Sequence, residues 1–175
     1  VVCDGGPKLK NLRIINNFNW SGGGIAIWGD SNHSSDPILS DLLVMGNCAF
    51  ADGGGLVIEN GNPTLSNITI RNNSSGQKGG GIYLGRGDSI TFSPGNRSSI
   101  YSNFAPKGAD IYSDPYYDGD ITVHALLDTF TVMQPTTYHV LGPLNFDIMN
   151  PIHDQVLNDL FVSPSGSNSN DGLTY

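Results

Sequence analysis

The sequence predicts an all-β fold, a right-handed parallel β-helix (solenoid) of about four coils with a C-terminal β-rich extension. Three observations support this prediction: a repeat of roughly 25 to 31 residues, short apolar strands with period two, and glycine and asparagine at one phase of successive repeats. The composition agrees, because only 14% of the residues are charged and Glu59 is the only glutamate, whereas glycines number 23. Such a mixture favours turns and half-buried strands over helices.

The repeat is marked by three features that keep the same phase. Segments 7–14, 37–44 and 63–70 each begin with proline, and these prolines are 30 and 26 residues apart. Each segment continues into an apolar-x-x-Asn step, and a fourth such step follows without the proline. A glycine cluster comes five or six residues after each asparagine. The asparagines are Asn17, Asn47, Asn73 and Asn103, and the clusters begin at Gly22, Gly53, Gly79 and, in degraded form, Gly108.

Alternating apolar residues in each repeat predict short strands with one face inside. One repeat cannot bury this face alone, so successive repeats are expected to stack as coils. The glycines suit tight corners, and the recurring asparagine suits a left-handed turn position from which its amide bonds along the stack. The predicted inward pairs are Leu12/Ile14, Leu42/Val44 and Ile68/Ile70 before the corners, and Ile25/Ile27, Leu56/Ile58 and Ile82/Leu84 after them.

Gly-Gly-x-Ile/Leu tetrapeptides that alternate with an apolar-x-x-Asn step resemble the repeats of chlamydial polymorphic outer-membrane proteins and related bacterial β-helix passengers. That family has phenylalanine where this chain has Ile or Val at the first position of the step. The resemblance covers residues 7 to about 113 and implies a pectate-lyase-like solenoid on a bacterial surface.

The repeat markers stop after residue 113, so we expect three parts. Residues 1–113 are predicted to form the coils, and residues 114–160 a β-rich segment that continues, ends or caps the solenoid, with a helical turn at 124–128. Residues 161–175 resemble the opening of pectate-lyase-like modules, which predicts the start of a following module. In an array this end becomes an assembly segment whose characteristic residues are Phe161, Val162, Pro164, Gly166 and Leu173.

Charge and hydropathy exclude several partner classes. A formal net charge of −8 argues against nucleic acid or an anionic membrane as partner, and no run of apolar residues is long enough to span a membrane. The chain begins without Met or a signal peptide, so any export signal is expected outside it. Cys3 and Cys48 either form a disulfide or are two small buried residues; the sequence leaves both alternatives open, although it favours the second.

No catalytic constellation is visible, so we expect no enzyme, no cofactor and no metal site. Fifteen aspartates and one glutamate show no paired arrangement beside the strands, and the four histidines are isolated. The strand after each glycine cluster is predicted to place Tyr83 and Tyr112 side by side on its outward face, with Trp28 on an earlier coil. Such an aromatic face would suit the binding of sugar rings. The alternatives are that the tyrosines are ordinary residues at the solvent edge or that they pack under residues 121–160.

Two functions follow from these features. The first is a structural or adhesive module of a large repetitive protein, secreted or on a bacterial cell surface, that associates with neighbouring modules or copies of itself. The alternative is a carbohydrate-binding or polysaccharide-degrading β-helix with glycans as partners.

Overall fold

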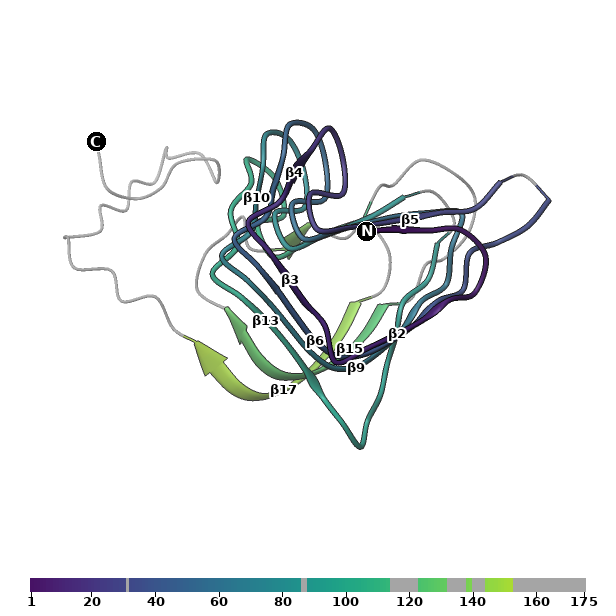
Figure 1. Ribbon diagram of the computed structural model, residues 1–175. Helices are drawn as coiled ribbons and strands as arrows, with labels where there is room; N and C mark the ends of the chain where they lie inside the picture. Colours follow the sequence, from purple (N-terminus) through teal and green to yellow (C-terminus); the bar gives the residue numbers. More distant parts are fainter. Residues whose placement is uncertain (31, 86–87, 114–122, 132–137, 140–143, 153–175) are drawn as a thin grey trace.

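The structure, a computed structural model, describes residues 1–30, 32–85, 88–113, 123–131, 138–139 and 144–152. Within these ranges the chain forms strands and turns and no helix. The strands are parallel and stack as a β-solenoid of about four turns, which confirms the predicted fold class (Figure 1). Successive turns of the chain form three sheets that run along the stack, the third of them shorter than the other two.

The first sheet contains the strands that follow the glycine clusters. They pair in register, so that Ile25, Leu56, Ile82 and Ile111 form one continuous row. Beta-branched and leucine side chains fit a strand that is buried on both faces. In order across the sheet the strands are β1 (Val2–Cys3), β5 (Ile25–Trp28), β8 (Leu56–Glu59), β11 (Ile82–Leu84), β14 (Ile111–Ser113) and β16 (Tyr138–His139).

The second sheet contains the strands that follow the prolines. Its long strands bend where Asp41 and Asn67 adopt φ values of 55° and 53°, and Asn11, with φ 55°, separates two shorter strands at the same position. Asparagine and aspartate tolerate this left-handed conformation better than other residues with a side chain. The strands are β2 (Lys8–Lys10), β3 (Arg13–Ile15), β6 (Ile38–Met45), β9 (Thr64–Arg71), β12 (Thr91–Phe92), β13 (Ser98–Tyr101), β15 (Val123–Thr131) and β17 (Leu144–Ile152).

The third sheet is short, and its strands begin directly after Asn17, Asn47 and Asn73. β7 (Cys48–Ala49) lies between β4 (Phe18–Asn19) and β10 (Ser74–Ser75), and a single bridge joins Ser74 to Phe104 of the next coil. Ala49 and Ser75 point inward and are buried, whereas Phe18 on the same sheet is exposed.

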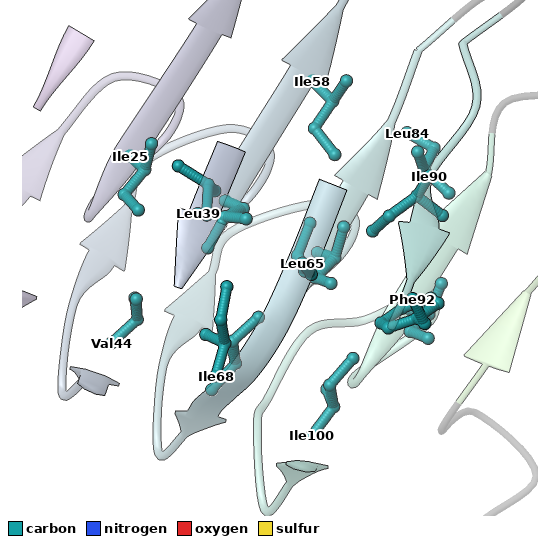
Figure 2. Packing of buried hydrophobic residues seen from close by; sticks show 14 of the residues in the cluster. Ile25, Leu39, Val44, Ile58, Leu65, Ile68, Leu84, Ile90, Phe92 and Ile100 are labelled. Carbon is teal, nitrogen blue, oxygen red and sulfur yellow. The ribbon is translucent and has the colours of Figure 1, made fainter. Parts of the chain in front are cut away.

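The core is a set of aliphatic rows inside the coils, shown in Figure 2. Ile25, Val44, Ile68 and Leu84 are buried there, as the period-two pattern predicted. Each fully buried aliphatic side chain stabilises the fold by about 1.5–3 kcal/mol. Leu12 differs from its equivalents, because it belongs to the first coil, has no coil on one side and is 39% exposed.

The predicted corners are present, but the left-handed asparagine position is one residue earlier than expected. The first glycine of each cluster has positive φ, and a Cβ on the second, such as Gly54, would overlap the carbonyl oxygens of Ser74 and Gly80. In the apolar-x-x-Asn step, positive φ occurs at Asn16, Gly46, Asn72 and Ser102, immediately before the predicted asparagines.

The asparagines themselves form a ladder along the stack. The Oδ1 atom of Asn73 accepts hydrogen bonds from the backbone N and the Nδ2 of Asn47, both at 3.0 Å, and Asn47 accepts the same pair from Asn17. Asn73 in turn donates to Asn103 at 3.0 Å through both atoms. The ladder ends at Asp110, whose Oδ1 accepts from the N and Nδ2 of Asn103 at 3.0 and 2.8 Å.

The described part of the predicted second segment continues the sheets. β15 pairs with β13, and β17 pairs with β15 over eight residue pairs. The helical turn predicted at 124–128 is wrong, because these residues lie within β15, where Val123, Ala125, Leu127 and Phe130 are buried in the core. Residues 161–175, with the predicted assembly residues, lie outside the described residues.

Candidate functional site

The predicted tyrosine pair is present but is not exposed. Tyr83 and Tyr112 are in register on neighbouring strands, with parallel rings 5.7 Å apart, as predicted. However, they are only 7% and 4% exposed and form a small cluster with Ala26 and Val57. The Lys78 Nζ lies 4.9 Å from the Tyr112 ring centroid, a cation–π distance. Of the alternatives that the sequence left open, burial excludes tyrosines at the solvent edge, and the two rings are not presented to a ligand.

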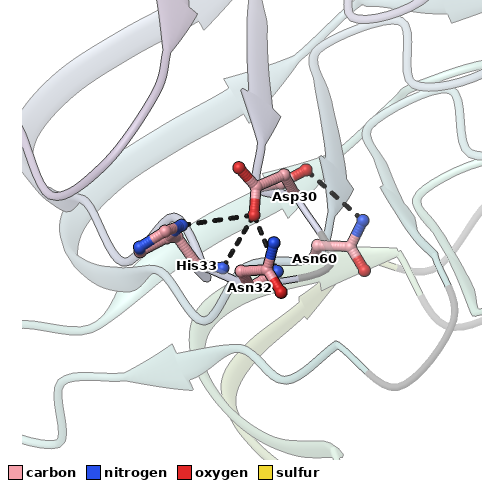
Figure 3. A network of polar contacts seen from close by, with 5 residues as sticks. Asp30, Asn32, His33 and Asn60 are labelled. Atoms are coloured by element: carbon pink, nitrogen blue, oxygen red, sulfur yellow. Dashed lines mark hydrogen bonds and ion pairs between the residues drawn. The ribbon is translucent and has the colours of Figure 1, made fainter.

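Trp28, the third predicted aromatic residue, lies at the end of β5 and is partly exposed. The turn that follows it is held by Asp30, whose Oδ1 accepts from the backbone N of Asn32 at 2.7 Å and of His33 at 2.8 Å (Figure 3). These backbone hydrogen bonds lower the pKa of Asp30. Asn60 of the next coil donates to the carbonyl of Gly29 at 3.4 Å. The network orders the turn, and its donors and acceptors are hydrogen-bonded to one another.

A second aromatic pair, which the sequence did not predict, is exposed on the side of the third sheet. Trp20 and Phe50 occupy equivalent positions on the first and second coils, and their rings stack with centroids 4.6 Å apart. They are 67% and 56% exposed, and Phe18 beside them is 72% exposed. Trp20 and Phe50 each lie three residues after the ladder asparagine of their coil, a spacing from which their register follows.

The first coil contributes an edge strand to all three sheets. β1, β2, β3 and β4 each have a neighbouring coil on one side only. At the same end, Asn17 is exposed and begins the ladder, and no hydrogen bond to its Oδ1 is present among the described residues. Trp20 follows β4, where its ring meets Phe50 and its side chain is 67% exposed. Backbone, amide and aromatic groups thus present one surface, which we term the first-coil edge.

Charge is distributed unevenly along the chain. Lys8, Lys10 and Arg13 are exposed on the first-coil edge, so residues 1–20 carry three cations against one anion, Asp4, a formal +2. Residues 114–175 contain eight aspartates and neither Lys nor Arg, a formal −8. The equivalent outward positions of the second coil, among them Ile38 and Leu43, are uncharged.

A cleft of about 590 Å³ opens on the outer face of the second sheet. Its lining includes the side chains of Asn67, Arg97, Ser99 and Asp128, with Pro94 and Met149. Arg97 precedes β13 and pairs with Asp147 of β17 at 2.7 Å. This hydrogen bond lowers the pKa of Asp147 and raises that of Arg97.

Other titratable groups form no reactive cluster in the described ranges. No group of three or more His, Cys, Asp or Glu side chains there is arranged to hold a metal ion. Asp88 is buried beside Gly61, whose N–H it accepts at 2.8 Å, and burial raises its pKa to about 6. Cys3 and Cys48 are free thiols, and burial raises the pKa of Cys3. In the part of the chain that is described, no helix is of a length and hydropathy to cross a membrane.

Fold and sites together define a parallel β-solenoid protein with a lateral cleft. No protein-family model, curated protein or solved structure matches the chain. The likeness of its repeats to those of the polymorphic outer-membrane proteins therefore stays a proposal.

Proposed function

We propose that the chain is a structural and adhesive module of a large repetitive bacterial protein, secreted or on the cell surface, that associates end to end with neighbouring modules or copies. The repeat pattern supports the further proposal that it is related to polymorphic outer-membrane protein passengers. The single observation that carries the proposal is the stack itself, in which each coil pairs with the next through parallel strands and the asparagine ladder, a mode of pairing that suits a further coil.

The chemistry of the first-coil edge suits another parallel coil, from a neighbouring module or from another copy. Edge strands offer backbone N–H and C=O groups that pair with an added strand. Asn17 offers an acceptor that suits the amide of an incoming asparagine, since every later ladder position is bonded in this way. The exposed ring of Trp20 offers a surface on which a further aromatic ring can stack, as it already stacks on Phe50.

The charge distribution favours a head-to-tail arrangement of copies. Two first-coil edges repel each other, because Lys8, Lys10 and Arg13 are exposed on both. Contact between this edge and the acidic C-terminal part of another copy instead brings opposite charges together. A head-to-tail contact that does not close into a ring produces filaments.

Light scattering and electron microscopy of the whole chain at low and high salt test this proposal. We expect concentration-dependent assemblies at low salt that dissociate as salt screens the charges. The double variant Lys8→Glu/Arg13→Glu should remain monomeric, whereas Arg71→Glu/Lys107→Glu, with the same change in net charge, should assemble as the native chain does. A chain ending at Leu160 tests whether the predicted assembly segment takes part.

Monomers at all concentrations and salt conditions would refute end-to-end association. Equal loss of assembly in both double variants would show that net charge matters and the first-coil edge does not. Trp20→Ala provides a neutral test of the same edge, and we expect it to weaken association without changing the salt dependence.

A further inference from the structure

We propose that the cleft beside Arg97 binds an uncharged oligosaccharide. This site differs from the tyrosine face predicted from the sequence and from the first-coil edge. It lies on the outer face of the second sheet, beside the turn that precedes β13. Its lining comes from this turn and from residues of β9, β13, β15 and β17. Its volume of about 590 Å³ is within the usual range for ligand sites.

Arg97 forms one wall of the cleft and fixes it to the next two coils. Its Nη1 donates to the carbonyl oxygens of Asp147 at 2.9 Å and Leu127 at 3.3 Å, and its Nη2 donates to the Asp147 carboxylate at 2.7 Å. The turn that contains Pro94 is thereby tied to β15 and β17. Arg97 is a positioning residue here, because three of its five N–H donors already bind acceptors in the protein.

The charges of the cleft disfavour an anionic ligand. Arg97 and Asp147 neutralise each other, which leaves Asp128 as the remaining formal charge in the lining. An acidic sugar such as a uronate would bring its carboxylate toward Asp128 with no cation left to compensate. A neutral ligand meets no such repulsion.

The polar groups of the cleft suit a ligand with several hydroxyl groups. The Asp128 oxygens accept from Asn150 at 3.1 Å and Thr129 at 2.8 Å, which fixes the carboxylate while leaving lone pairs for two adjacent ligand hydroxyls. The hydroxyl of Ser99 and the Oδ1 of Asn67 add a donor and an acceptor on neighbouring coils. Pro94 and the exposed Met149 provide apolar surface for the C–H face of a sugar ring.

The experiment is titration calorimetry of the whole chain with cellohexaose, mannohexaose, maltohexaose and hexagalacturonate. We expect at least one neutral hexamer to bind and hexagalacturonate to bind more weakly. Ser99→Trp, which fills the cleft from an outward position, and Asp128→Asn should each raise the Kd at least about tenfold. Ser40→Trp, an outward serine of β6 away from the cleft, is the matched control and should leave the Kd unchanged.

Thermal unfolding of each variant shows whether the fold is intact, so a loss of binding in a folded Ser99→Trp chain is attributable to the cleft. The proposal is wrong if no neutral hexamer binds at millimolar concentration. It is equally wrong if Ser99→Trp binds as the native chain does, or if hexagalacturonate binds more tightly than every neutral hexamer. Light scattering of the same samples separates this result from end-to-end association, which uses other residues.

Discussion

Replacing Asn73 by alanine removes the centre of the asparagine ladder. The side chain makes four hydrogen bonds in a buried position: its Oδ1 accepts from the N and Nδ2 of Asn47, and its Nδ2 donates to the Val44 carbonyl and to Asn103 Oδ1. With a net contribution of about 0.5–1.5 kcal/mol for each hydrogen bond, the loss is about 4 kcal/mol. That is a large part of the total stability of about 5–15 kcal/mol that is typical of folded domains.

Denaturant unfolding measures the effect, with Asn17→Ala as the matched control. Asn17 occupies the equivalent position on the first coil, but it is exposed, and water replaces the bonds that its side chain loses. We expect this control to cost about 0.5 kcal/mol, with unchanged dependence on denaturant concentration in both variants. If the two substitutions differ by less than about 1 kcal/mol, the ladder does not stabilise the fold as its geometry indicates.

Three further predictions concern single positions. The pKa of Asp88 is about 6 in the folded chain, above the ordinary value of 3.8, so the stability that the protonated carboxyl contributes is present below about pH 4 and is lost as pH rises through about 6. Asp88→Asn should therefore raise the free energy of unfolding at neutral pH by up to about 3 kcal/mol and flatten its pH dependence. A variant less stable than the native chain at neutral pH would contradict this. Gly54→Ala should lower the melting temperature by several degrees because its Cβ meets two backbone carbonyl oxygens, whereas Gly95→Ala, whose Cβ meets no atom within 4 Å, should leave it unchanged. A thiol reagent should modify half-buried Cys48 in the native chain and buried Cys3 only after unfolding, a difference that mass spectrometry detects and that equal rates would refute.

The coil architecture was predictable because each coil repeats the same chemistry. Positions such as Val44 and Ile70 must point inward for a stack of coils to exist, and the structure confirms that they do. The position of the left-handed residue within each repeat was not predictable. The sequence does not distinguish a residue that adopts positive φ from a neighbour whose side-chain amide forms hydrogen bonds along the stack. Asn72 does the first and Asn73 does the second.

The candidate sites were less predictable because period two separates the faces of a strand but does not show what covers them. Tyr83 and Tyr112 are on the outward face, yet they are buried. The cleft depends on Arg97 reaching Asp147, fifty residues away in sequence, and no repeat marker connects these two. The Trp20–Phe50 stack could have been predicted from the sequence, because each of the two residues follows a ladder asparagine by three positions.

Asp110 gives the ladder a direction that bears on how such a chain can lengthen by duplication. Asn17, Asn47 and Asn73 each donate to the asparagine of the following coil, so an added coil with an asparagine at this phase could be inserted before Asn103 without breaking the pattern. Asn103 donates instead to the carboxyl group of Asp110, which has no amide N–H with which to continue the series of side-chain amides. One substitution at the third position of a glycine cluster therefore fixes where the ladder stops, while the number of repeats before it stays free to change.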